Sequence, residues 1–375
     1  MHIAIAGAGL LGRLLAFELA LAGHAVEVFD PAPDAQGRGA AGWTAAGMLS
    51  PVAELESADA QVFADGLRSL ERWPAIVAAL RVHAPAQPVT LAADGSLLLA
   101  HRGDEGAAER IVSLLRAKAG PAHQPQPIGL AALRELEPDL HGPAHAWLLP
   151  AEGRIHTVEA MGALAAAGSA LGVRWHWGCD VVEAAARRLL VAETADAASA
   201  MHARRAEASA RPLRAVDCDL AIDVRGLGAR PQLPMRGVRG EVFWLHAPGV
   251  TLGRPARLLH PRHRVYLVPR PGDLIVVGAS EIESEDRSPV SVRTTVELLA
   301  AAHSVLPGLA EARIVHAESN LRPALPDNLP RVDAADGLLR INGLFRHGWL
   351  IAPALAERGL RAAGLAAMDV PGGSR

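Results

Sequence analysis

The sequence predicts an α/β fold in which a Rossmann-like dinucleotide-binding domain is interleaved with a second domain built on a mixed, largely antiparallel sheet. The chain opens with an apolar strand and a glycine-rich turn, and its middle holds three strands joined by short turns. Its end returns to a strand followed by a helix. Because the two patterns alternate along the chain, each domain should be assembled from several segments.

The first 30 residues carry the pattern of a dinucleotide-binding unit. It consists of a strand over 2–6, the glycines Gly7, Gly9 and Gly12, a helix over 10–22, a strand over 25–29 and then Asp30. In the spacing G-x-G-x-x-G, the first glycine permits a tight turn and the second lets the backbone approach a pyrophosphate. The third lets the helix pack closely against the strand.

The residues around this turn complete the prediction. The helix N-terminus at Leu10 and Leu11 offers free N–H groups to phosphates. Asp30 stands where an acid that binds the ribose is expected. A bound dinucleotide follows from this arrangement, but its identity does not.

Composition excludes several classes of protein. The chain has 375 residues, half of them hydrophobic, and a net charge of −3 with scattered basic residues, so we expect no nucleic-acid partner. Its two cysteines lack C-x-x-C spacing and are predicted to be reduced thiols. The longest apolar stretch, 160–173, is too short to cross a bilayer. We therefore expect a cytoplasmic protein without a secretory signal or membrane span.

The remaining elements follow from hydrophobic periodicity and turn signals. We expect helices over 64–80, 105–119, 158–171, 291–306 (with Ser291 as N-cap) and 349–363, and strands over 95–100, 147–149, 173–177, 181–182, 217–223, 238–245, 265–268, 274–278 and 338–342. Segment 189–215 is expected to form an exposed hairpin or loop. The dinucleotide domain is predicted to comprise 1–85, 147–232 and 317–375, and the second domain 86–146 and 233–316.

Candidate site residues lie in four places. A run of small residues over 39–51 allows close approach to a flat ligand, although an ordinary tight loop would look the same. Tyr266 is the sole tyrosine and lies in a predicted strand. Arg322 precedes a proline, and Arg346 lies between the last strand and the last helix. The histidines have no carboxylate or cysteine at ligand spacing, so no metal site is predicted.

Several motifs together resemble those of one family. They are the opening fingerprint, Thr44–Leu49, Tyr266–Arg270, Val277–Ser280, Leu321–Pro323 and Phe345–Gly348. In this order they resemble the D-amino-acid oxidase family of FAD-dependent oxidoreductases, and most of all the glycine oxidases of bacterial thiamine biosynthesis. The resemblance covers nearly the whole chain and implies a Rossmann-like FAD domain joined to a substrate domain.

The resemblance also implies roles for individual residues. Arg322 corresponds to the arginine that binds the substrate carboxylate, Tyr266 to the tyrosine that assists it, and Arg346 to an arginine near flavin and substrate. The start of the last helix is expected to stabilise negative charge on the flavin. Implied contacts to non-covalently bound FAD are Gly7, Gly9, Leu10, Leu11, Gly12, Asp30, Ala46, Gly47, Met48, Val181, Gly226, Arg346, Gly348, Trp349 and Leu350.

The implied reaction is oxidative deamination of glycine or a small amino acid by molecular oxygen, giving the imino or keto acid and hydrogen peroxide. The glycine imine would serve the thiazole moiety of thiamine, with a hand-off to thiazole synthase, and the enzyme would be a homo-oligomer. Alternatives are a D-amino-acid dehydrogenase with another electron acceptor, a nicotinamide-dependent dehydrogenase, and a protein that keeps FAD structurally. Glu281 departs from the family pattern, and either a pocket-facing or a solvent-facing position is open.

Overall fold

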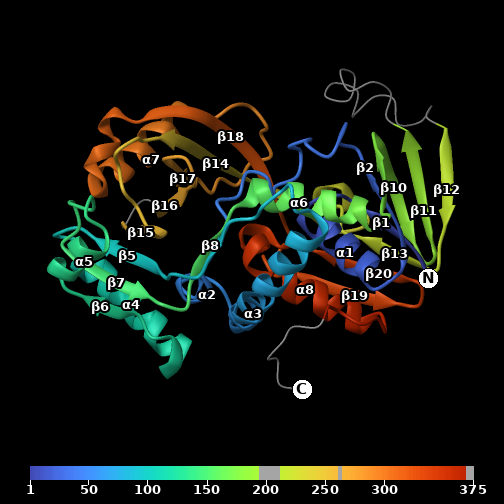
Figure 1. The fold of residues 1–375 in the computed structure, drawn as a ribbon, viewed down its shortest axis with the longest axis horizontal. Helices are drawn as coiled ribbons and strands as arrows, with labels where there is room; N and C mark the ends of the chain where they lie inside the picture. The colour runs from blue at the N-terminus through green and yellow to red at the C-terminus, as the bar shows by residue number, and fades with distance from the viewer. Residues whose placement is uncertain (194–211, 261–263, 369–375) are drawn as a thin grey trace.

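The computed structural model describes residues 1–193, 212–260 and 264–368, and two large sheets dominate it (Figure 1). The six-stranded sheet has the order β19-β20-β13-β1-β2-β9, and the eight-stranded sheet the order β18-β14-β17-β16-β15-β5-β7-β6. In Figure 1 they occupy opposite sides of the molecule. A small sheet of β3 (Met48–Leu49), β8 (Gly153–Ile155) and β4 (Leu91–Ala92) accompanies them.

The six-stranded sheet is the predicted Rossmann-like unit. Its strands are β1 (His2–Ala6), β2 (Ala25–Asp30), β9 (Arg174–Trp177), β13 (Leu220–Asp223), β19 (Arg331–Ala335) and β20 (Leu338–Asn342). All neighbouring pairs are parallel except β19 with β20. The sequence therefore predicted the central strands correctly, but β19 was missed because four of its five residues are exposed and give no alternation.

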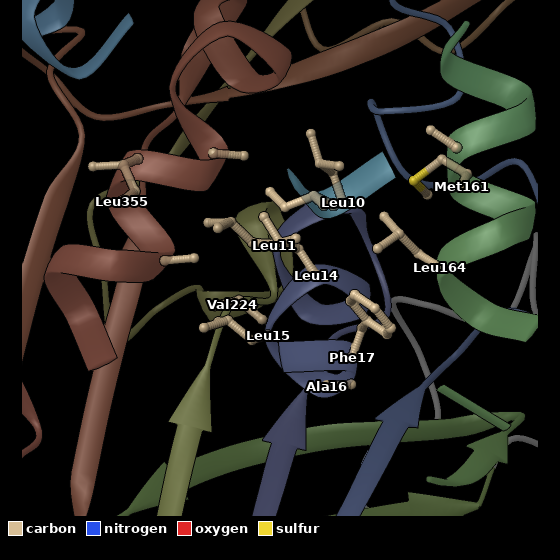
Figure 2. Packing of buried hydrophobic residues seen from close by; sticks show 14 of the residues in the cluster. Leu10, Leu11, Leu14, Leu15, Ala16, Phe17, Met161, Leu164, Val224 and Leu355 are labelled. Carbon is tan, nitrogen blue, oxygen red and sulfur yellow. The ribbon is translucent and has the colours of Figure 1, made fainter. Parts of the chain in front are cut away.

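Helices cover one face of this sheet. They are α1 (Leu10–Leu21), α3 (Ala60–His83), α6 (Thr157–Ala170) and α8 (Gly348–Ala362). Figure 2 shows Leu14 and Phe17 of α1 packed among side chains of the neighbouring helices, including Met161 of α6 and Leu355 of α8. The expected helices over 10–22, 158–171 and 349–363 are confirmed to within a residue or two, and that over 64–80 is extended at both ends.

A three-stranded sheet covers the opposite face. It contains β10 (Cys179–Ala185), β11 (Arg188–Glu193) and β12 (Leu213–Asp217). Strands β11 and β12 pair antiparallel, as in the expected hairpin, but Leu189 and Val191 are buried against Ala4 and Phe29 and not exposed. Residues 194–211 lie outside the described part of the chain. The strand expected over 217–223 is confirmed as β13 at 220–223, but its first residue belongs to β12, which ends at Asp217 in the other sheet.

The eight-stranded sheet is mixed and mostly antiparallel, as predicted. It contains β5 (Ser96–Ala100), β6 (Gln126–Ile128), β7 (His145–Leu149), β14 (Arg236–His246), β15 (Ala256–Leu259), β16 (Arg264–Arg270), β17 (Leu274–Gly278) and β18 (Arg313–Ala324). Helix α7 (Val292–Val305) packs on it, and Ser291 caps this helix by accepting a bond from Thr294 N. Helix α4 (Glu105–Ala119), which packs with its other face, matches the expected range.

The sheets divide the chain slightly differently from the expected domain boundaries. Strands β7 and β18 both pair within the eight-stranded sheet, so boundaries at 147 and 317 would cut through them. Strand β18 was not predicted, because its first five residues are all exposed and it contains Pro323. A proline is tolerated there because β18 is an edge strand, which pairs only with β14.

Shorter elements complete the structure. Helices α2 (Pro51–Glu54) and α5 (Leu130–Leu136) were not predicted, because both are too short to show a periodic pattern. No helix in the described ranges is both long and apolar enough to cross a membrane.

Candidate cofactor and substrate site

One large cavity lies between the two main sheets. Its volume is about 1550 Å³, more than a pocket for a single small ligand requires. Of the predicted catalytic and cofactor-binding residues, all except Gly12 line it. The folded chain thus brings together motifs from its beginning, middle and end.

The glycine fingerprint forms the nucleotide end of this cavity. Gly7 has a φ of +102°, which favours glycine, and a Cβ there would lie 2.9 Å from the carbonyl oxygen of Val224. A Cβ on Gly12 would lie 1.8 Å from the Gly7 carbonyl oxygen. Gly12 therefore has the predicted packing role without bordering the cavity.

Asp30 lies at the edge of the same end. Its carboxylate accepts bonds from the backbone N–H groups of Ala8 (2.6 Å) and Ala32 (2.8 Å). Burial raises the pKa of Asp30, and the two backbone bonds oppose that shift. The side chain fixes the glycine turn and still borders the space where a ribose would lie.

The run of small residues forms a wall in the middle of the cavity. Gly47 has a φ of +67°, and a Cβ there would lie 2.1 Å from the carbonyl oxygen of Ile155. Arg270 of β16 donates to the Ala46 carbonyl, and Asn320 of β18 donates to the Thr44 hydroxyl at 3.1 Å. Strands of the eight-stranded sheet therefore position this segment, which supports a close approach to a flat ligand.

Other predicted cofactor contacts border the same space. The first residues of α8, Gly348, Trp349 and Leu350, line the cavity, and no side chain caps this helix. Gly226 donates its N–H to the Asn342 side chain at 2.9 Å, and Val181 accepts from Arg225 at 2.6 Å. The free helix N-terminus can stabilise negative charge on a bound group.

Arg322 projects from β18 into the substrate end. Its Nη1 donates to the carbonyl oxygens of Ser280 (3.0 Å) and Arg239 (3.3 Å). Gly240 on β14 makes room for the guanidinium, because a Cβ there would lie 2.5 Å from Arg322 Cζ. Burial lowers the pKa of Arg322. Among the described residues, no carboxylate lies within ion-pair distance of Arg322, so a bound anion can supply the missing charge.

Tyr266 borders the same end and lies over a second glycine. It pairs with Gly278 of β17, where a Cβ would lie 2.7 Å from the tyrosine hydroxyl oxygen. Burial raises the pKa of Tyr266, and neighbouring Arg322 opposes that shift. The hydroxyl therefore stays protonated at neutral pH and can donate a hydrogen bond.

Arg346 is held by two glutamates. Its Nη2 lies 2.8 Å from Glu54 Oε2, and its Nη1 lies 3.1 Å from Glu281 Oε2. Glu54 also accepts from Arg257 Nη2 at 2.8 Å. Burial would raise the pKa of Glu54, but Arg346 and Arg257 outweigh it and hold the pKa well below its usual range. Glu281 borders the cavity, and its side chain is also 43% exposed to solvent.

We refer to Glu54, Arg257, Glu281, Arg322 and Arg346 as the arginine–glutamate cluster. Sequence reasoning missed Glu54 and Arg257, because they meet only when α2 and β15 are folded together. It also missed the supporting role of Gly240. The signal for Gly240 was a glycine inside a predicted strand, which often marks a close approach.

The site joins a glycine-fingerprint cavity to a half-buried arginine on a mostly antiparallel sheet, an arrangement expected of an oxidoreductase that binds a dinucleotide. A family model described as FAD dependent oxidoreductase (DAO) matches residues 2–358, and the chain belongs to this family. The glycine cradle and the uncapped α8 terminus fit such a cofactor. Family membership confirms the resemblance drawn from the sequence motifs.

Relatives agree with this assignment. A Rhizobium etli protein provisionally named thiamine biosynthesis oxidoreductase ThiO is 35% identical over 95% of this chain and 94% of its own. Glycine oxidase of Geobacillus kaustophilus is 26% identical over 94% of this chain and 89% of its own.

Solved structures share the fold. The crystal structure of the Geobacillus kaustophilus glycine oxidase superposes with a TM-score of 0.80 at 24% identity, covering 98% of this chain and 95% of that chain. An iminodiacetate oxidase of Chelativorans gives 0.78 at 22% identity, with coverages of 98% and 96%. These likenesses confirm the predicted fold class.

Proposed function

We propose that this FAD-dependent oxidoreductase oxidises glycine or another small amino acid to the imino or keto acid, with oxygen as acceptor and hydrogen peroxide as second product. The observation that carries the proposal is the half-buried guanidinium of Arg322, which faces the cavity and has carbonyl oxygens as its hydrogen-bond partners among the described residues. Two parallel N–H donors match a carboxylate. The relative named ThiO and the glycine oxidases support this substrate class.

The chain's own groups would orient the substrate. Arg322 would hold the carboxylate, and the protonated hydroxyl of Tyr266 would add a further donor. Fixing the carboxylate in this way aligns the Cα–H bond for oxidation and removes an entropic part of the barrier. FAD, held non-covalently by the glycine fingerprint, Ala46–Met48 and the start of α8, supplies the two-electron acceptor when bound.

The nucleotide end would hold the other half of the cofactor through main-chain groups. The free N–H groups at the start of α1, at Leu10 and Leu11, would face the pyrophosphate. Asp30 would keep the turn in place through Ala8 and offer its remaining lone pairs to a ribose hydroxyl. The uncapped N-terminus of α8 would stabilise charge that develops on the ring system.

Further proposals concern the use of the reaction product and the assembly and location of the protein. We propose that the glycine imine serves the thiazole moiety of thiamine, by hand-off to thiazole synthase, since a relative that covers nearly the whole chain is named for that biosynthesis. A homo-oligomeric state and a cytoplasmic location stay predictions. Membership in a FAD-dependent family argues against a nicotinamide-dependent dehydrogenase.

Anaerobic mixing tests the proposal. Purified holoprotein is mixed with glycine, sarcosine and D-alanine while the flavin absorbance is followed, and air is then admitted and peroxide measured. We expect at least one substrate to bleach the flavin and peroxide to form on aeration. Bleaching without peroxide would favour the dehydrogenase alternative. No bleaching with any small amino acid would favour a structural role for FAD.

A further inference from the structure

Glu281 is held in place by strand pairing on both sides. Ser280 N donates to the Glu241 carbonyl at 3.3 Å, and Ile282 exchanges backbone bonds of 3.0 and 2.9 Å with Arg239 of β14. The main chain on both sides of position 281 is therefore bonded to β14. The position of the carboxylate beside the cavity follows from this pairing and not from a free loop.

Glu281 completes the coordination of Arg346. The Nε and Nη2 atoms of Arg346 bond Glu54, and Nη2 also bonds the Ser57 hydroxyl at 2.6 Å. Nη1 has Glu281 as its partner, at 3.1 Å. Without the Glu281 carboxylate, Nη1 would face the cavity as an additional cationic donor.

The charges of the arginine–glutamate cluster determine what the cavity can accept. Three guanidinium groups and two carboxylates leave one net positive charge. A substrate with one carboxylate and an uncharged amine cancels that charge. A substrate with two would leave one negative charge close to Glu54 and Glu281, where like charges repel.

We propose that Glu281 sets the substrate class of this enzyme, admitting amino acids with one carboxylate and rejecting those with a second acidic group. This inference rests on the proposed function. The fold alone does not impose such a choice, since an enzyme with this fold is named for iminodiacetate, which carries two carboxylates. The selection has to come from local charges, and Glu281 supplies one of the two negative ones in the cluster.

Equilibrium binding of two unreactive ligands tests the inference. Methoxyacetate and diglycolate share an ether backbone and differ by one carboxylate. Their dissociation constants are measured on holoprotein by flavin difference spectra and by calorimetry. We expect the wild type to bind methoxyacetate at least about tenfold more tightly, and Glu281→Gln to shift the ratio toward diglycolate by at least about tenfold.

Controls separate the charge from structural damage. Glu283→Gln removes a carboxylate two residues away that pairs with Arg236 and does not line the cavity, so its ratio should equal that of the wild type. Glu281→Gln combined with Arg346→Gln should lose the gain for diglycolate. Glu281 is 43% exposed, so neutralising it should not prevent folding.

The binding and bleaching results distinguish failure of the role of Glu281 from failure of the proposed function. Equal affinity of the wild type for both ligands, or an unchanged ratio in Glu281→Gln, overturns the role of Glu281 even if glycine bleaches the flavin. A wild type that binds neither ligand and is not bleached by glycine overturns the proposed function and this inference together.

Discussion

At the nucleotide end of the cavity, the wall includes the glycine-rich turn of residues 7–11, with Asp30 beside it. At the substrate end, the wall carries charged side chains from α2, β15, β18, the segment after β17 and the turn just before α8. The nucleotide end depends on the absence of side chains at its glycines, because this absence leaves room for a cofactor. The second depends on charges that must balance. The two ends should therefore fail in different ways when they are mutated.

The largest effect is expected from adding one carbon at the nucleotide end. In Gly12→Ala the new Cβ would lie 1.8 Å from the Gly7 carbonyl oxygen, so α1 must move away from β1. We expect a loss of about 3 kcal/mol in the free energy of unfolding and loss of bound FAD. Urea denaturation and the flavin content of the purified protein measure both.

Gly9→Ala is the matched control. Its Cβ would lie 3.6 Å from Ala40 Cβ, an ordinary contact. We expect nearly normal stability with weakened FAD binding. Equal free energies of unfolding for Gly9→Ala and Gly12→Ala would contradict the inferred difference in packing between these two glycines.

The next effect concerns a charge at the substrate end. Arg322→Ala removes the cation that lacks a carboxylate partner, so we expect KM to rise about 100-fold or more while FAD stays bound. Steady-state kinetics and the flavin spectrum measure this. Arg313→Ala, on the same strand and 71% exposed, should behave as the wild type. Unchanged kinetics in Arg322→Ala would remove this residue from the site.

A smaller effect is expected from displacing the same guanidinium. In Gly240→Ala the new methyl group would lie 2.5 Å from Arg322 Cζ and push the side chain aside. We expect KM to rise about tenfold with FAD retained. Adding Gly240→Ala to Arg322→Ala should then raise KM little further, because the two substitutions act on one contact. Additive effects would contradict this explanation.

The smallest effect concerns a glutamate outside the cavity. Glu27 bonds Arg174, His2 and His176, and although burial opposes the shift, these bonds lower its pKa to about 2. When folding lowers the pKa of a carboxylate, the ionised group stabilises the folded protein at pH values above the pKa of the unfolded state. This contribution is lost as pH falls through the folded-state pKa. Glu27→Gln should cost about 1–2 kcal/mol at pH 7, allowing for partial exposure.

The pH dependence gives this prediction its sign. The stability curves of the wild type and Glu27→Gln should converge as pH falls from about 4.5 toward 2, where Glu27 becomes protonated. Glu71→Gln, which removes an exposed ion pair with Arg68, should show almost no difference at either pH. A constant gap between the curves at low pH would be inconsistent with an ionised Glu27.

The difference between the two ends also explains which parts of the structure could be predicted from the sequence. The strand, glycines and helix of residues 2–22 form locally, so periodicity and spacing predicted them. Strands of the eight-stranded sheet such as 274–278 were found because they are short apolar runs bounded by turns. Strand β18 was missed, because its exposed first half resembles a polar loop, although it carries Arg322.

The substrate end shows the limit of local patterns. The roles of Arg322, Tyr266 and Arg346 came from a family resemblance and not from spacing. Glu54 and Arg257 belong to segments about 200 residues apart, and only the folded chain shows that they form an ion pair. Neither local sequence indicates that the charges of Glu54 and Arg257 balance each other.

Strand β18 also restricts how this enzyme can change over evolutionary time. Asn320, which holds the small-residue wall, and Arg322 stand two positions apart and share one face of the strand. Substitutions can therefore tune either residue separately. Insertion or deletion of a single residue before Asn320 would turn both side chains to the opposite face at once. We expect natural variants of this protein to differ in sequence along β18 but to keep its length.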